Sequence, residues 1–216
     1  MSDAVVVIDV IGEGRADVGR EPQPKRLDEG IVPILTHKLC GKPANMRVVT
    51  RPFATLQGKG LDKKVQFAKR QAFYSRRNGA VFVMDSEGDL AGRRSKMVEG
   101  RDRELPSFPM AIGIAHPCIE AWLLADPMAI RRGLELANTP NVTEEPEALP
   151  APCQDGARSP KGALRDAAGA RKGELSSKEK DQVAAAMNDM LVVRNRCPRG
   201  FAPFADEVES RIRSLF

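Results

Sequence analysis

The chain has few of the side chains that build zinc centres, disulfide frameworks or histidine-based active sites. Its 216 residues include four cysteines, which are far apart and form no Cys-x-x-Cys pair. Structural zinc is therefore not expected, and the thiols should be reduced, as in the cytosol. Only two histidines, His37 and His116, are present, so a histidine-rich metal site or a Ser-His-Asp triad has little material to draw on.

Long hydrophobic runs are also missing. No stretch approaches the roughly 20 apolar residues that a helix needs to cross a bilayer. The apolar run at residues 4–8 is short, and no basic region precedes it. We therefore expect a cytoplasmic protein with neither a signal peptide nor a membrane partner. A chain of this length can bury a sizeable core, and one α/β domain with a helical extension is the natural organisation.

A modest positive charge is present instead. Lysine and arginine number 34 against 29 aspartate and glutamate residues, for a formal net charge of +5. A protein that clusters carboxylates and is still basic overall carries its cations elsewhere, which suits a phosphate-backbone partner. Charge alone does not identify a partner, so the expectation of DNA or RNA depends on the motifs described below.

Apolar runs rich in β-branched residues alternate with helical patterns over the first part of the chain. The expected strands are 5–10, 47–52, 80–84 and 110–115, and the expected helices are 30–39, 62–77 and 117–125. Asp62 would be the N-cap of the second helix, and Pro117 would lie in the first turn of the third. This order predicts an α/β fold with a mostly parallel central sheet flanked by helices.

The composition changes after about residue 138. Residues 139–160 are rich in proline and show no period, so they are predicted to form a long loop. Helices are then expected at 161–169, 177–194 and 202–215. The predicted organisation is an α/β domain over 1–138, the Pro-rich loop over 139–160, and a C-terminal helical extension over 161–216 that packs on the same domain.

Two acidic clusters each follow a predicted strand. Glu13 stands between two glycines after the first strand, and Asp85, Glu87 and Asp89 follow the third. The carboxyl ends of parallel strands meet at one edge of a sheet, where ligands collect. Carboxylates gathered in this way stay ionised only around a cation, and oxygen ligands suit Mg²⁺ or Mn²⁺. We therefore predict a divalent-metal site with these four residues as ligands.

The two clusters resemble the signature of the Toprim domain of topoisomerases, primases and nucleases of the overcoming-lysogenization-defect type. They stand as Glu13-Gly14-Arg15-Ala16-Asp17 and Asp85-Ser86-Glu87-Gly88-Asp89, with glutamate where the family commonly has a middle aspartate. Residues 116–126, which contain Glu-Ala-Trp-Leu-Leu-Ala-Asp, and parts of the tail are similar to a small Toprim-like group, domain-of-unknown-function family 4276.

The resemblance covers almost the whole chain and implies several further features. The fold would be Toprim-like, with a Rossmann-like topology. Asp17 and Glu120 would lie near the metal ligands, although Glu120 could equally anchor a basic side chain as part of the structure. Toprim nucleases are often paired with ABC-type ATPases in bacterial antiphage systems, so the resemblance implies such a partner.

Basic residues that could contact nucleic acid follow two of the strands. Lys59 lies between two glycines ahead of a predicted helix, a suitable place for an anion, although the spacing does not match a P-loop. Lys63 follows in that helix, and Arg93, Arg94 and Lys96 follow the second acidic motif. These residues could bind phosphates, and Lys59 could also stabilise charge in a transition state.

The preferred hypothesis is a metal-dependent phosphodiesterase or nuclease that acts on DNA or RNA. Glu13, Asp85 and Glu87 would be catalytic through the metal, and Lys59 would assist. Either Glu13 or His116 could relay the proton, and the sequence does not choose between them. The alternative is a non-catalytic subunit that binds metal and docks on an ATPase. Nucleotidyl transfer is less favoured because the short chain has no template-binding module.

Overall fold

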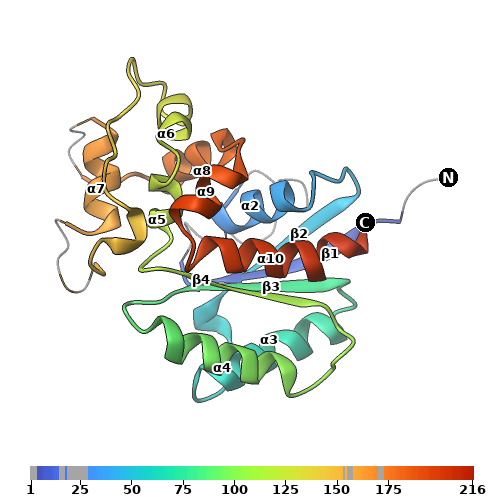
Figure 1. The fold of residues 1–216 in the computed structure, drawn as a ribbon. Helices are drawn as coiled ribbons and strands as arrows, with labels where there is room; N and C mark the ends of the chain where they lie inside the picture. The colour runs from blue at the N-terminus through green and yellow to red at the C-terminus, as the bar shows by residue number, and fades with distance from the viewer. Residues whose placement is uncertain (1–3, 15–17, 19–28, 153, 155–157, 170–172) are drawn as a thin grey trace.

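A parallel sheet is the centre of the fold. The computed structural model describes residues 4–14, 18, 29–152, 154, 158–169 and 173–216. Within those residues the strands are β1 (Val6–Gly12), β2 (Met46–Pro52), β3 (Gly79–Asp85) and β4 (Met110–Ala115). They pair in parallel in the order β2-β1-β3-β4 (Figure 1). The predicted α/β class with a mostly parallel central sheet is confirmed.

Both faces of the sheet are covered, which explains why the strands read as continuous apolar runs. Side chains alternate between the faces along each strand. Ile8, Val10 and Val81 belong to the core on one face, whereas Ile11 and Phe82 belong to the core on the other. Paired residues of neighbouring strands point to the same face of the sheet, since Ile11 of β1 lies opposite Phe82 of β3.

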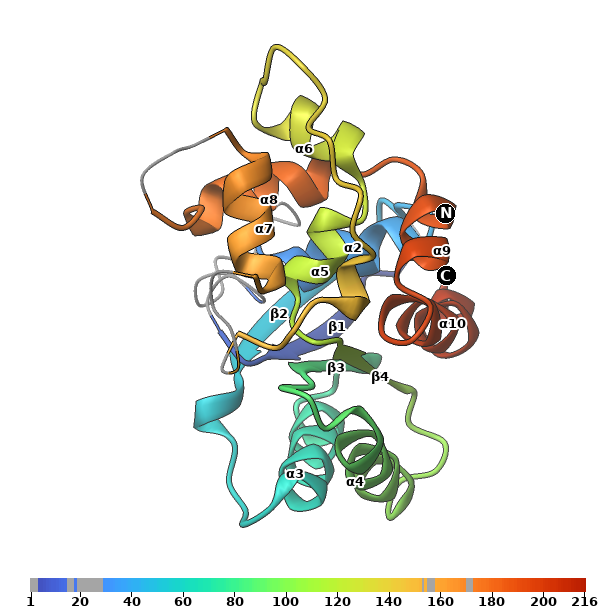
Figure 2. The ribbon, with the colours of Figure 1, turned by 60° about the vertical axis from the view of Figure 1, so that its left-hand side comes forward.

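Helices form a layer on each face of the sheet, as Figures 1 and 2 show. One layer is α3 (Leu61–Tyr74) with α4 (Leu90–Asp102), and the other contains α2 (Ile31–Leu39) and α10 (Phe201–Arg211). The remaining helices lie on the α2 side: α5 (Glu120–Leu124), α6 (Pro127–Gly133), α7 (Pro160–Ala167), α8 (Ser177–Ala186) and α9 (Met190–Arg196). Short 3₁₀ turns are η1 (Phe53–Thr55), η2 (Pro146–Ala148) and η3 (Arg213–Leu215). None of the helices found among the described residues is long and apolar enough to cross a bilayer.

Two of the predicted helix starts are wrong. The N-cap of α3 is Gly60, and Asp62 lies inside the first turn, where its carboxylate pairs with Arg103 (Oδ2–Nη1 3.2 Å). Pro117 lies before α5 and outside any helix. Its carbonyl oxygen accepts a hydrogen bond from the backbone N–H of Glu87 (3.2 Å), which ties this segment to the end of β3. The helix therefore begins only at Glu120.

The predicted helix at 177–194 is two helices. α8 ends before Met187, whose backbone is extended (φ −70°, ψ 107°), and the side chain of Asp189 caps α9 by accepting the N–H of Leu191 (2.9 Å). The start of α8 has a complete capping box, in which Ser176 and Glu179 each accept the backbone N–H of the other. The break lets α8 and α9 cover different parts of the core.

The C-terminal helix α10 packs directly on the edge strand β4. A Cβ atom at Gly113 would lie 2.5 Å from Cδ2 of Phe204, so only glycine allows this approach. Phe204 stacks on Trp122 of α5 with ring centroids 5.1 Å apart, and Phe201 meets the same indole edge-on at 5.3 Å. Trp122 is fully buried, so the one tryptophan of the chain is a core residue.

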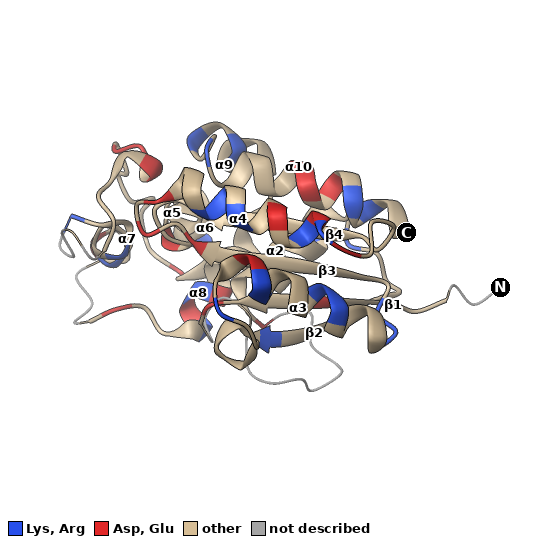
Figure 3. Ribbon diagram, turned by 90° about the horizontal axis from the view of Figure 1, so that it is seen from below, with Lys and Arg blue, Asp and Glu red and all other residues tan. Residues whose placement is uncertain are grey.

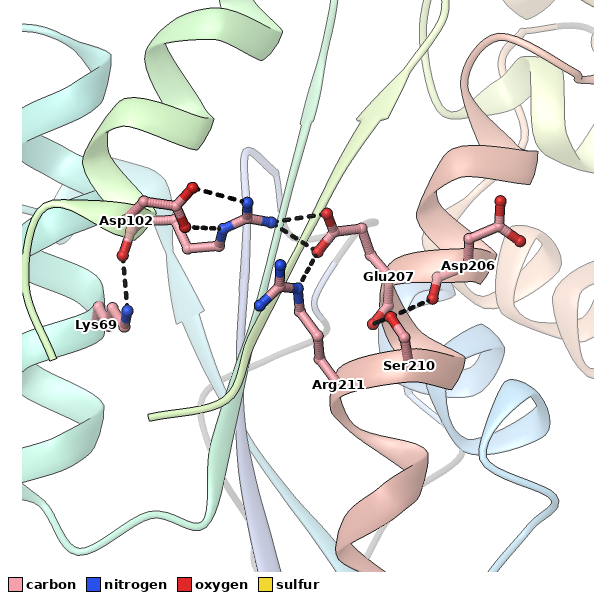
Figure 4. Close-up of polar contacts among 7 residues, drawn as sticks. Lys69, Asp102, Asp206, Glu207, Ser210 and Arg211 are labelled. Atoms are coloured by element: carbon pink, nitrogen blue, oxygen red, sulfur yellow. Dashed lines mark hydrogen bonds and ion pairs between the residues drawn. The ribbon is translucent and has the colours of Figure 1, made fainter. Parts of the chain in front are cut away.

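An ionic network centred on the buried side chain of Arg101 joins the two helix layers past β4 (Figure 4). Arg101 of α4 reaches Glu207 of α10 through Nη1, at 2.7 and 2.8 Å from the two carboxylate oxygens. Asp102 and Arg211 complete the network, and Lys69 of α3 donates to the backbone oxygen of Arg101 (2.6 Å). The arginine side chain is only 7% exposed, so its charge depends on these partners.

We predict that Gly113→Ala lowers the free energy of unfolding by about 1–3 kcal/mol, because the new methyl group overpacks the contact with Phe204. Urea denaturation measures the change. Adding Phe204→Leu removes the ring that the methyl group meets, so the double variant should lose less than the sum of the two single variants. Strict additivity would show that Gly113 does not set the distance between α10 and β4.

Candidate active site

The carboxyl ends of β1 and β3 lie where the chain's connections diverge. β1 and β3 are neighbours in the centre of the sheet. The chain continues from β1 to β2 in one direction across the sheet, and from β3 to β4 in the opposite direction. Ligands of open α/β sheets bind in the crevice at such a switch point, outside the carboxyl ends of the strands. Glu13 directly follows β1, and Asp85 is the last residue of β3. The two acidic motifs therefore meet at the position where this architecture binds ligands.

Glu13 and Asp85 are in direct contact. Oε2 of Glu13 accepts a hydrogen bond from the backbone N–H of Asp85 (3.2 Å). Oδ1 of Asp85 accepts the backbone N–H of Ile119, just before α5 (2.9 Å). The Glu13 side chain is 30% exposed and so remains reachable from solvent. The structure thus brings these two predicted residues together and fixes the second by a hydrogen bond.

Arg93, in the first turn of α4, places a positive charge among the acids. Its Nη2 pairs with the carboxylate of Glu87, and its Nη1 lies 3.9 Å from Oε1 of Glu13. Nη1 also donates to the backbone oxygen of Asp85 (2.7 Å). A cation in the first turn opposes the helix dipole, so the carboxylates stabilise it there. Arg93, which the sequence assigned to nucleic-acid binding, is therefore part of the acidic cluster.

Glu87 and Asp89 have different tasks at the start of α4. Glu87 has a backbone φ of +47°, which costs a non-glycine residue about 1 kcal/mol or more. The side chain of this residue pairs with Arg93. Asp89 is the N-cap of α4, and its Oδ1 accepts the N–H of Gly92 (2.9 Å). Of the four predicted metal ligands, Asp89 is thus committed to the helix and Glu87 to an ion pair.

The donor set fits a hard cation that shares its coordination with water and substrate. Across the described part of the chain, no three His, Cys, Asp or Glu side chains converge as a ligand set for a metal. Mg²⁺ often uses only one or two carboxylates, with waters and substrate phosphates completing the shell. Glu13 and Asp85 meet this requirement in donor type, and the Glu13 carboxylate contacts the backbone of Asp85. Glu87 would join them only by leaving Arg93.

The predicted phosphate-binding residues are exposed. Lys59 lies in the loop that follows β2, at the same edge of the sheet as the acids, and Lys63 is exposed on α3. Arg94 and Lys96 are exposed on α4. Basic and acidic positions are interspersed along the helices in Figure 3. Asp17, predicted to lie near the ligands, is outside the described residues.

Glu120 anchors a basic side chain, which is one of the two roles the sequence left open. Its Oε1 lies 2.7 Å from Nζ of Lys180 on α8, and the two side chains are 4% and 10% exposed. Burial opposes ionisation of Glu120, but the charge and hydrogen bond of Lys180, together with the charge of Lys161, lower its pKa below the ordinary value. The pair ties α8 of the C-terminal extension to α5, next to the acidic site.

His116 follows β4 and contacts a serine that the sequence did not single out. Its Nδ1 lies 2.8 Å from Oγ of Ser86. Ser86 is fully buried and stands between Asp85 and Glu87 in the sequence. Burial lowers the pKa of the half-buried imidazole, and the nearby charge of Arg199 lowers it further. A serine between two acids has the pattern of an ordinary turn, and its partner is 30 residues away, so no local signal marks the contact.

Comparison with known proteins found no match to this chain among protein-family models, curated proteins or solved structures. The resemblance to Toprim domains therefore stays a prediction. The chemistry of the site depends on the arrangement of Glu13, Asp85 and Arg93 described above.

We predict that Lys180→Met lowers the free energy of unfolding by about 3 kcal/mol, because it leaves the buried carboxylate of Glu120 without its partner. Chemical denaturation measures the loss. Lys178→Met is the matched control, since Lys178 is exposed on the same helix and should change stability by less than about 0.5 kcal/mol. Equal effects of the two substitutions would contradict a structural role for the Glu120–Lys180 pair.

Proposed function

We propose that this protein is a phosphodiesterase that cleaves DNA or RNA with the help of Mg²⁺ or Mn²⁺. The observation that carries the proposal is the contact of Glu13 with Asp85 at the β1/β3 switch point, with Arg93 beside them. In a metal–phosphate complex, oxygen ligands such as these carboxylates suit the metal, and a guanidinium suits the phosphate. A metal bound there would activate a water molecule and offset charge on the phosphate.

The residues around the acid pair would each contribute a defined task. Glu13 and Asp85 would hold the metal, and the hydrogen bond from Ile119 keeps Asp85 in place. Asp89 fixes the start of α4, and so the position of Arg93 beside the site. Arg93 would pair with the phosphate once the metal has taken over the carboxylates. Lys59, at the same edge of the sheet, would add a further positive charge.

Nucleic acid is proposed as the substrate because exposed cations follow β3, which ends at Asp85, and also lie in the part of the chain after β2. These are Lys59, Lys63, Arg94 and Lys96. The resemblance to Toprim nucleases favours the same substrate class and work with an ABC-type ATPase in antiphage defence, and the scattered cysteines favour a cytoplasmic location. The alternative is a non-catalytic metal-binding subunit of such an ATPase, in which Arg93 would stay paired with the acids instead of binding a phosphate.

Cleavage of plasmid, single-stranded DNA and tRNA in the presence of Mn²⁺ tests the proposal. Glu13→Gln and Asp85→Asn should each lower the rate at least about 10²-fold, the scale for losing one positioned catalytic group. Both substitutions keep the shape of the side chain, and asparagine still offers an oxygen to Ile119. Asp206→Asn, on the exposed side of α10, should retain full activity. Full activity in both site variants would refute the proposed site.

The place of Arg93 leads to a second prediction, on metal affinity. Arg93→Gln removes a positive charge that competes for Glu13 and Glu87, so Mn²⁺ should bind about tenfold more tightly. The same variant should cleave more slowly, because the phosphate loses its cationic partner. Calorimetric titration without nucleic acid measures the affinity. Arg94→Gln removes the same charge from the next, exposed position and should leave the affinity unchanged.

If Arg93→Gln binds Mn²⁺ no more tightly than the wild-type protein, the guanidinium does not compete with the metal. If neither protein binds Mn²⁺, the acid pair is not a metal site, and the proposed function fails with it.

A further inference from the structure

The Ser86–His116 contact connects the end of β4 to the turn that carries the acidic motif. Ser86 is fully buried, and its backbone N–H donates to the oxygen of Ala115 (2.8 Å), which fixes the two strand ends together. Asp85 lies opposite Ala115 in the pairing of β3 with β4, so His116 is one residue beyond the neighbour of a proposed metal ligand. The imidazole therefore stands at the same edge of the sheet as the acid pair.

The surroundings of the serine hydroxyl determine where its one proton goes. Oγ of Ser86 lies 3.3 Å from the carbonyl oxygen of Pro117, 3.4 Å from the backbone N of Gly88 and 2.8 Å from Nδ1 of His116. A carbonyl oxygen only accepts, and a backbone N–H only donates. The contact with Pro117 is therefore favourable only if the hydroxyl donates to it, and the contact with Gly88 uses one of the two lone pairs.

That leaves one lone pair of the hydroxyl for His116. A neutral imidazole donates through one nitrogen and accepts through the other. If Nδ1 carries the proton, it donates to this lone pair, and each of the three contacts of Ser86 has a proton between its two heavy atoms. If Nδ1 instead accepted the hydroxyl proton, two oxygen atoms would face each other at 3.3 Å without a proton. The first arrangement satisfies the hydroxyl completely.

We propose that Ser86 holds His116 as the Nδ1–H tautomer, so that the lone pair of Nε2 is the proton acceptor of the active site. In this role Ser86 is a positioning residue and His116 is the general base. The base role rests on the proposed function, whereas the tautomer does not. Nε2 has no hydrogen-bond partner within the described residues, and the ring is half-buried, so one nitrogen is held and the other is left for the reaction.

The geometry also decides between the two bases that the sequence left open. The Glu13 carboxylate accepts the N–H of Asp85 and lies near Arg93, so its two oxygens are already engaged by a donor and a cation. Burial and the nearby charge of Arg199 lower the pKa of His116, so the imidazole is neutral near neutral pH and has a lone pair for a proton. Glu13 is thus suited to binding a cation, and His116 to taking a proton.

In the proposed hydrolysis, one proton passes through His116. A water oxygen forms the new bond to phosphorus, and its proton moves to Nε2 of His116, which becomes an imidazolium. The bond from phosphorus to the leaving ester oxygen breaks, and its electron pair stays on that oxygen. The imidazolium then returns its proton to the leaving oxygen, and the neutral Nδ1–H tautomer is restored.

The tautomer is tested in the ¹⁵N-labelled full chain without metal or substrate, from long-range ¹H–¹⁵N correlations of the imidazole rings. The chain supplies its own comparison, because the second histidine, His37, has Nε2 at 3.4 Å from the carbonyl oxygen of Pro43. A carbonyl oxygen requires a donor, so His37 should be the Nε2–H tautomer. A His37→Gln variant assigns the two sets of signals.

We expect His116 to be the Nδ1–H tautomer in the wild-type protein and to lose that preference in Ser86→Ala. An Nε2–H signal for His116 in the wild-type protein would overturn the proposal, even if the variant fails to fold. So would an unchanged tautomer in a folded Ser86→Ala protein.

Kinetics test the base role separately. Ser86→Ala should lower kcat about tenfold and leave KM and the affinity for Mn²⁺ unchanged, since it disturbs only the orientation of the proton acceptor. A shifted tautomer with unchanged kcat would remove His116 as the base. If the wild-type protein cleaves no nucleic acid, the proposed function and the base role both fail, whereas the tautomer is still decided by the spectra.

Discussion

Burial of both faces of the central sheet forces charged side chains toward the ends of the strands. Asp9 shows what a charged side chain inside a strand requires. It lies within β1 and is fully buried, and two arginines hold its carboxylate, Arg51 at 2.8 Å and Arg77 at 3.1 Å. The other acids of the central strands, Glu13 and Asp85, lie at the carboxyl ends, where water, a guanidinium or a metal can reach them. The site is therefore placed by the same constraint that builds the core.

Three strand ends contribute to the site, and each supplies a different kind of group. The end of β1 supplies the carboxylate of Glu13, the end of β3 supplies Asp85 and the buried hydroxyl of Ser86, and the end of β4 supplies the imidazole of His116. Arg93 of α4 also lies there, because it donates a hydrogen bond to the backbone oxygen of Asp85. This distribution makes the geometry depend on strand register, since a slip of one residue would turn Asp85 to the opposite face.

The strands and the acid pair could be predicted because both leave a local mark in the sequence. Each apolar run ends at an acid with glycine adjacent or close by, and parallel strands bring such ends together, so Glu13 and Asp85 could be predicted without knowledge of the sheet order. The contacts of Ser86 with His116 and of Glu120 with Lys180 span 30 and 60 residues, and no periodicity encodes them. The helix break before Asp189 was missed because its cap lies inside a segment of otherwise helical composition.

The ionic link between Arg101 and Glu207 limits how this protein can associate with others. β4 is an edge strand, and an uncovered edge invites another chain to add a strand by hydrogen bonding. α4 and α10 approach each other past β4 and are joined there by a charge pair that is largely removed from solvent. A partner that adds a strand at β4 would have to break this pair and separate the two helix layers. Strand addition at this edge of the sheet is therefore costly.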